Sequence, residues 1–66
     1  MQIQLNGQNR QAPAQTTITA LLAAEGLADR RVAVEVNGTI VPRSQHHTHV
    51  LHEGDRIEIV QALGGG

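Results

Sequence analysis

Hydrophobic and polar residues alternate in three segments of the chain, at residues 1–5, 32–36 and 56–61. A period of two residues is typical of a strand that buries one face and exposes the other. In the last of these segments, Ile57 and Ile59 share one face. The pattern therefore predicts three strands, each with one face in a common core.

Two Asn-Gly pairs predict tight turns that add further strands. Asn6-Gly7 and Asn37-Gly38 consist of residues that tolerate positive φ, which a two-residue hairpin turn requires. The strand after the first turn, residues 8–12, is weakly patterned and is expected at a sheet edge. The strand after the second turn, residues 39–41, is short, because Pro42 lacks a backbone donor and ends it.

Between the two predicted hairpins, the spacing of apolar residues changes to that of a helix. We expect a helix near residues 17–25, capped by the hydroxyl of Thr16 or Thr17. Gly26 is placed to end it in the left-handed conformation, with Leu27 closing the cap through an apolar contact. The buried stripe of this helix follows the i, i+3, i+4 pattern: Ile18, Leu21 and Leu22.

The order of hairpin, helix, hairpin and closing strand predicts an α+β fold with a single domain over residues 1–66. One helix covers only one face of a sheet, so the other face is expected to be partly solvated. The apolar first strand and the isoleucines of the last strand favour central positions for both, with a right-handed crossover between the hairpins. We therefore expect a β-grasp, or ubiquitin-like, fold with a mixed sheet of four to five strands and one main helix on one face.

Composition excludes several classes of function. The 66 residues include no cysteine and no aromatic residue, and the formal net charge is −1. Disulfides and thiolate zinc sites are thus ruled out, and stacking platforms and basic patches for nucleic acid are absent, so we expect no nucleic-acid partner. No apolar run is long enough for a membrane span, and no signal-peptide pattern is present. We expect a small, soluble, cytoplasmic domain that contacts no membrane.

No arrangement of catalytic residues is apparent, so we do not expect an enzyme. Ser44 and His46 would act as nucleophile and base only if a third group oriented the histidine, and none is evident. A domain of this size also has little room for a water-excluding pocket of about 300–1,000 Å³.

Residues 43–52, here called the histidine segment, are polar and predict an irregular loop with one helical turn. The segment contains all four histidines of the chain: His46, His47, His49 and His52. Neutral imidazoles bind zinc or nickel, but this spacing contains no i, i+4 pair of a helix face, and no carboxylate is obviously placed to orient the rings. The alternative is a solvated loop of histidines, which change charge near neutral pH. We expect the solvated loop and no specific metal site.

Leu63 and three glycines follow the last predicted strand directly. We expect residues 63–66 to form a flexible arm that ends in a free carboxylate on Gly66 and reaches about 10 Å beyond the fold. Because glycine has no Cβ, such an arm enters a channel too narrow for other residues. The alternative is a frayed terminus without function.

Val60 and Ala62 lie on the strand face opposite to Ile57 and Ile59. They are either ordinary surface residues or, together with Leu63, a docking surface for a partner beside the tail. We favour docking, because a partner that receives the tail needs to bind the last strand as well.

Five segments carry a resemblance to a known family: Met1-Gln2-Ile3, Val32-Ala33-Val34-Glu35-Val36-Asn37, Ile40-Val41-Pro42-Arg43, Glu53-Gly54-Asp55-Arg56-Ile57 and Gly65-Gly66. With these motifs the chain resembles, over essentially its whole length, the ThiS family, the bacterial sulfur carriers of thiamine biosynthesis. The combination of mid-chain motifs with the glycine end is specific, whereas a terminal Gly-Gly is shared by ubiquitin-like proteins generally.

This resemblance implies a protein substrate with no cofactor of its own. An adenylating enzyme of the E1-like, ThiF type would use ATP to activate the carboxylate of Gly66, with Gly64 and Gly65 in the channel behind it. A cysteine desulfurase would be the source of sulfur for a C-terminal thiocarboxylate. A thiazole synthase of the ThiG type would then accept that sulfur.

Two other functions stay open at this point. The chain could carry sulfur for molybdopterin or another pathway, although molybdopterin carriers are longer and have aromatic residues near the tail. It could also be a non-catalytic β-grasp interaction module with an inert tail. The family usually ends in two glycines, and Gly64 adds a third here; the simplest interpretation keeps Gly66 as the reactive end.

Overall fold

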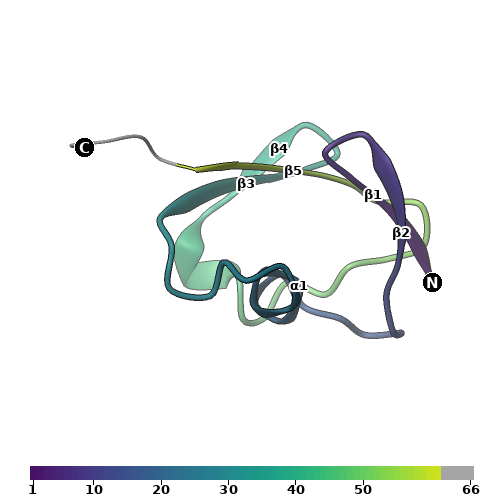
Figure 1. Cartoon of the computed structure of the whole chain (residues 1–66), viewed down its shortest axis with the longest axis horizontal. Helices are drawn as coiled ribbons and strands as arrows, with labels where there is room; N and C mark the ends of the chain where they lie inside the picture. The colour runs from purple at the N-terminus through teal and green to yellow at the C-terminus, as the bar shows by residue number, and fades with distance from the viewer. Residues whose placement is uncertain (62–66) are drawn as a thin grey trace.

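The computed structural model describes residues 1–61 and contains one mixed sheet of five strands and one α-helix. The strands lie in the order β2-β1-β5-β3-β4, with β1 and β5 parallel and all other neighbours antiparallel. This arrangement confirms the predicted β-grasp fold, with β5 at the centre between β1 and β3 (Figure 1). The elements are β1 (Gln2–Leu5), β2 (Gln8–Gln11), α1 (Ile18–Ala24), β3 (Val32–Val36), β4 (Thr39–Val41), the 3₁₀ helix η1 (Arg43–Gln45) and β5 (Arg56–Gln61).

Both predicted Asn-Gly turns form. In the first, Asn6 has φ 49° and Gly7 has φ 82°. In the second, the angles are 53° at Asn37 and 86° at Gly38. Positive φ at both central residues is the type I′ geometry, whose twist matches that of the flanking strands. Each turn therefore fixes the register of its hairpin.

Helix α1 begins and ends where the sequence predicts. The Thr17 hydroxyl accepts a hydrogen bond of 3.1 Å from the backbone N–H three residues later. At the other end, Gly26 has φ 76°. The Leu27 N–H donates to the carbonyl of Leu22 at 2.8 Å, and the Gly26 N–H donates to that of Ala23 at 3.1 Å. These paired bonds satisfy carbonyls that the end of a helix otherwise leaves free.

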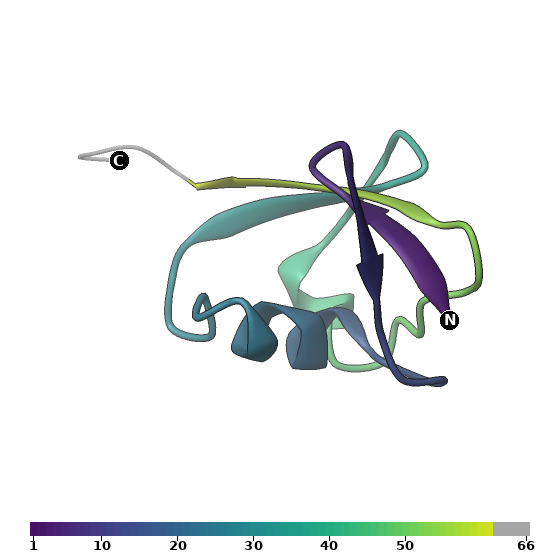
Figure 2. The ribbon, with the colours of Figure 1, turned by 45° about the vertical axis from the view of Figure 1, so that its right-hand side comes forward.

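The core lies between one face of the sheet and the layer formed by α1 and the histidine segment, as Figures 1 and 2 show. Aliphatic side chains alone fill it, since the chain has no aromatic residue. None of the described elements covers the other face of the sheet. The buried residues are Ile3, Leu5, Ile18, Leu21, Leu22, Val34, Val36, Val41, Leu51 and Ile57.

The histidine segment contains the predicted helical turn, η1, and much of it is exposed as expected, but it is not a solvated loop throughout, because His46 and Leu51 are buried. Leu51 is only 1% exposed and belongs to the core. The backbone carbonyls of His46 and His49 accept hydrogen bonds of 3.1 Å from the N–H groups of Thr19 and Ile18, respectively. A helix leaves its first N–H groups without intrahelical partners. The segment satisfies two of them and so must pack against α1.

Candidate functional site

Strand β5 positions the end of the described chain. Strand β3 lies alongside β5 as far as Val32, which is opposite Gln61. Strand β1, in contrast, pairs with β5 only through Gln4 opposite Arg56 and Leu5 opposite Ile57. The N-terminus and the end of β5 lie on opposite sides of the molecule in Figure 1. The end of β5 is thus held by strand pairing with β3 on one side only.

Beyond the end of β1, the side chain of Asn6 forms hydrogen bonds with the backbone of β5. The Asn6 Oδ1 accepts a 2.8 Å hydrogen bond from the Ile59 N–H, and its Nδ2 donates to the Ile59 carbonyl at 3.4 Å. A carboxamide presents the same donor and acceptor as a peptide group. Asn37 holds the beginning of β5 similarly, because its Oδ1 accepts from the Arg56 N–H at 2.9 Å.

The uncovered face of the sheet carries an apolar surface at β5, β3 and β4. Val60 is 61% exposed and Ile40 is 63% exposed, the two large apolar side chains that are most open to solvent among residues 1–61. Ala33 lies opposite Val60 and is also exposed. We call Ala33, Glu35, Ile40, Glu58 and Val60 the open face; strand alternation places all five on the same side of the sheet.

Two carboxylates lie in the middle of the open face. Glu35 on β3 is directly opposite Glu58 on β5, and Ile40 on β4 is opposite Glu35 on its other side. Neither glutamate forms an ion pair with another residue in the described range. Like charges directly opposite each other in a sheet are destabilising. A partner that brings a cation to this position would relieve the repulsion.

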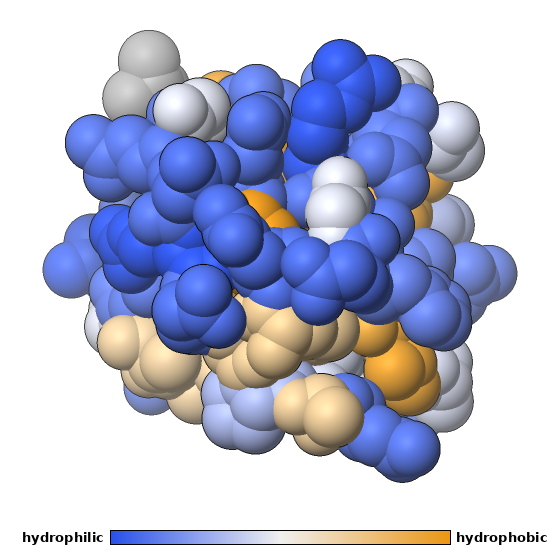
Figure 3. Space-filling model, turned by 90° about the vertical axis from the view of Figure 1, so that its right-hand side faces the viewer, coloured by the Kyte–Doolittle hydropathy of each residue, from blue (hydrophilic) through white to orange (hydrophobic). Residues whose placement is uncertain are grey.

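The other end of the molecule offers no comparable surface. Strand β2 (Gln8–Gln11) is exposed at every position, as expected of a polar edge strand. Figure 3 shows that this end, with the β1–β2 hairpin and the N-terminus, is mostly hydrophilic, with its broadest apolar area in the lower part and small apolar spots elsewhere. A docking surface is therefore better supported at the open face.

The predicted site residues are only partly within the described structure. Val60 is exposed on the face opposite to Ile57, as the strand pattern predicts. Ala62, Leu63 and the three glycines of the predicted tail, Gly64, Gly65 and Gly66, lie outside the described residues.

The histidines do not gather into one site. The His46 side chain is buried, and its Nε2 lies 3.0 Å from the carbonyl oxygen of Val41 rather than next to Ser44. His47 and His52 are exposed, and His49 is half-buried. Over residues 1–61, no three histidine or carboxylate side chains lie close enough to hold a metal ion. Nor is any helix in this part of the chain long and apolar enough to cross a membrane.

Sequence reasoning missed Ile40 and the two glutamates of the open face. Glu35 lies opposite Glu58 because of the register between β3 and β5, and the whole histidine segment separates these two strands in the sequence. The alternation of Val32, Val34 and Val36 did place Glu35 on the solvent side. It could not show which residue would lie opposite.

The central strand, the two hairpins, the single helix and the apolar surface beside the end of β5 define a ubiquitin-like β-grasp protein. Residues 3–66 match the model of the ThiS family, and the chain belongs to this family.

Individual relatives agree with this assignment. The chain is 36% identical to the sulfur carrier protein ThiS of Escherichia coli (strain K12) over 66 residues, all of both chains. It is 46% identical, over its full length, to part of a thiazole synthase of Magnetococcus marinus (strain ATCC BAA-1437 / JCM 17883 / MC-1). The chain spans about a fifth of the length of the thiazole synthases that it matches.

The fold agrees with a solved relative. The structure superimposes on the crystal structure of a thiamine biosynthesis protein (ThiS) from Geobacter metallireducens with a TM-score of 0.86. Sequence identity is 29%, and the match covers 100% of both chains.

Proposed function

We propose that this chain carries sulfur as a thiocarboxylate on Gly66 and donates it to thiazole formation. The observation that carries the proposal is the family match, which extends through the three terminal glycines. The similarity of the whole chain to a fifth of each of two thiazole synthases supports a thiazole synthase as the acceptor. This similarity favours thiazole formation over a role in molybdopterin synthesis.

The chemistry begins with an unreactive carboxylate. A carboxylate oxygen of Gly66 attacks the α-phosphorus of ATP, the bond to pyrophosphate breaks, and an acyl-adenylate forms. A sulfur nucleophile at the oxidation level of sulfide then adds to the carbonyl, and AMP leaves with the electrons of the broken bond. If a cysteine desulfurase supplies the sulfur as a persulfide, the terminal sulfur of the persulfide adds to the carbonyl and an acyl disulfide forms as AMP leaves. A thiol then attacks the other sulfur of this acyl disulfide and forms a disulfide with it, the original S–S bond breaks, and the thiocarboxylate is released.

In this scheme the chain is a substrate and its partners are the catalysts. A ThiF-type adenylating enzyme binds ATP and performs the activation, and a ThiG-type synthase takes up the sulfur. Glycine suits the reacting position, because a Cα without a side chain leaves the carbonyl open to attack. The carrier needs only to present Gly66 and to be bound by each partner in turn.

The partners dock on the open face, where Val60 and Ile40 supply exposed apolar area next to the end of β5. Interfaces concentrate their energy in a few central anchors surrounded by polar residues. The open face has the reverse arrangement, with exposed apolar side chains around the central Glu35–Glu58 pair, so a partner has to neutralise the two carboxylates as well as cover the apolar area. A partner with an apolar patch and an arginine or lysine would complement it.

The decisive experiment measures ATP–pyrophosphate exchange by the cognate adenylating enzyme with the 66-residue chain as substrate. We expect exchange with the complete chain and none after deletion of Gly66. The urea unfolding midpoint should not change, because glycine contributes no side chain to a core. Exchange that persists without Gly66 would refute the proposal and favour an interaction module with an inert tail.

A further inference from the structure

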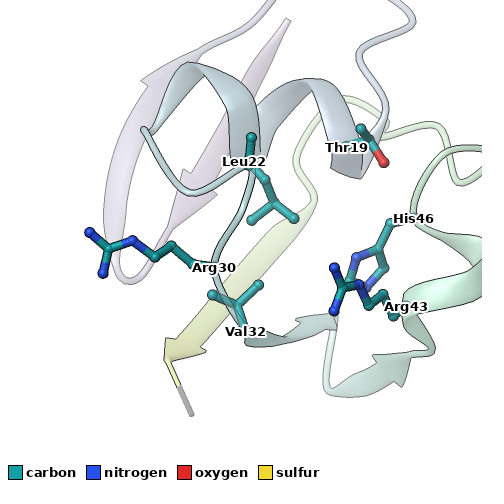
Figure 4. A pocket seen from close by; sticks show the side chains of 7 residues that line it. Thr19, Leu22, Arg30, Val32, Arg43 and His46 are labelled. Atoms are coloured by element: carbon teal, nitrogen blue, oxygen red, sulfur yellow. The ribbon is translucent and has the colours of Figure 1, made fainter. Parts of the chain in front are cut away.

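A pocket with a volume of about 200 Å³ lies between α1, the loop before β3, and η1. Leu22 and Val32 form its apolar wall, and Arg43 and His46 lie together on the other side (Figure 4). Thr19 also lines the pocket, from the first turn of α1. No carboxylate is among the lining residues. The pocket therefore combines cationic and polar groups with no negative charge to neutralise them.

The His46 ring has a fixed orientation in this pocket. Its Nε2 lies 3.0 Å from the Val41 carbonyl oxygen, which only accepts, so Nε2 carries a hydrogen in this contact. The second nitrogen, Nδ1, has no hydrogen-bond partner in the described range, and it is not fully shielded from solvent. The His46 residue is 5% exposed and lines the pocket.

Two further polar groups of the pocket also lack partners within residues 1–61. The Arg43 guanidinium forms no ion pair and no hydrogen bond, and the Thr19 hydroxyl forms no hydrogen bond. Arg30 lines the pocket as well, but in Figure 4 its guanidinium points away from Arg43 and His46. The free donors thus come from separate elements, η1 and α1, and face one space.

We propose that this pocket binds a small tetrahedral oxyanion of the phosphate class through Arg43, Thr19 and His46. A guanidinium offers paired N–H donors whose geometry matches the oxygens of such an anion. A volume of about 200 Å³ is below the range of about 300–1,000 Å³ of sites for drug-sized ligands, so the site suits a small ion. The site is independent of whether the chain carries sulfur.

Protonation of His46 controls the third donor. In the neutral ring with hydrogen on Nε2, Nδ1 is an acceptor that repels an oxyanion, whereas in the protonated ring Nδ1 is a donor. Two charged side chains line the pocket, Arg43 from η1 and Arg30 from the loop before β3. The lining residues from α1 (Thr19 and Leu22) and from β3 (Val32) add no charge. The site therefore binds anions more tightly when His46 is protonated.

The pocket also lies close to the end of the central strand. Val32, which lines it, is directly opposite Gln61 at the end of β5. Val32 is partly buried against the core, so this one residue both lines the pocket and pairs with the end of β5. An anion bound here sits on the helix side of the sheet, away from the open face.

Titration of the ¹⁵N-labelled full chain with sodium sulfate at constant ionic strength tests the site, because sulfate keeps its charge across neutral pH. We expect saturable shifts at Thr19, Arg43 and His46. Arg43→Gln should weaken binding about tenfold or more, as expected for loss of a hydrogen bond to a charged group. Arg31→Gln is the matched control, since Arg31 is exposed and does not line the pocket.

Thr19→Val, which keeps the side-chain shape, should weaken binding without unfolding the chain. Inorganic phosphate and AMP, each as a separate titrant, then distinguish a site for free anion from one for a nucleotide phosphate; saturable binding of either supports the site. Equal weakening by Arg31→Gln and Arg43→Gln, or shifts that never saturate, would overturn it.

Discussion

The carboxamide of Asn6 pairs with the backbone of Ile59 and continues the β1 side of the sheet after β1 itself has ended. The two hydrogen bonds, of 2.8 Å at the Ile59 N–H and 3.4 Å at its carbonyl, span 53 residues of sequence. They hold the second half of β5 in place, so the exposed side chain of Val60 is presented from a fixed backbone. A turn residue thereby contributes to the geometry of the proposed docking surface.

Replacement of Asn6 by glycine should isolate this contribution. Glycine keeps the positive φ of the turn but removes both hydrogen bonds, and we expect a loss of about 1–2 kcal/mol in the free energy of unfolding. Gln15→Gly is the control, because Gln15 also has positive φ (69°) and its side chain forms no hydrogen bond with a described residue. Urea denaturation measures both. Equal midpoints for the two variants would show that the Asn6–Ile59 contact contributes nothing.

The core requires Leu51 from the histidine segment as much as Leu21 from α1. Leu51 is 1% exposed and Leu21 is 5% exposed. Truncation of either to alanine should cost about 2–5 kcal/mol, a large part of the stability of so small a domain. Thermal unfolding followed by circular dichroism provides the comparison, with exposed Gln11→Ala as control. A Leu51→Ala variant as stable as the control would mean that the segment does not belong to the core.

The opposed glutamates of the open face should lower stability in the free protein. Glu58→Gln removes the repulsion with Glu35 and should raise the free energy of unfolding by about 0.2–1 kcal/mol at low salt. The gain should shrink at high salt, where exposed charges are screened. Asp29→Asn in the exposed loop after α1 is the control for the loss of one negative charge. A gain of the same size from Asp29→Asn would point to net charge rather than to the pair.

Docking through the open face predicts a loss of partner binding without a loss of fold. Val60→Asp places a charge on the exposed apolar surface and should raise the KM of pyrophosphate exchange about tenfold or more, as expected for an interface anchor. The unfolding midpoint should change little, because Val60 is 61% exposed. Gln11→Asp on edge strand β2 adds the same charge away from the open face. If the two variants had the same KM, the open face would not be the docking surface.

The tail makes a separate prediction about the reacting end. Gly65→Ala adds one methyl group at the position that we place in the partner's channel, and we expect the rate of adenylation to fall while the carrier still folds. Intact mass spectrometry after incubation with the complete sulfur-transfer system should show the thiocarboxylate on the C-terminal peptide of the unmodified chain. Sulfur found in any other peptide would contradict Gly66 as the carrier position.

The secondary-structure elements and their order follow from local signals in the sequence. Alternation of apolar residues set the strands, Asn-Gly pairs set both hairpins, and Thr17 and Gly26 set the ends of α1, because each of these signals acts over a few residues. The apolar faces of the first and last strands were also enough to place them near the centre of the sheet. The family resemblance likewise rested on local motifs.

Contacts between residues far apart in the sequence depend on the tertiary structure. The register of β3 against β5 placed Glu35 opposite Glu58, and the packing of the histidine segment against α1 buried His46 and Leu51. A polar segment gives no periodic signal of burial, since its role is to satisfy the free N–H groups of Ile18 and Thr19 through backbone carbonyls. Such hydrogen bonds involve the backbone, which is the same for every residue, so side-chain patterns could not reveal them.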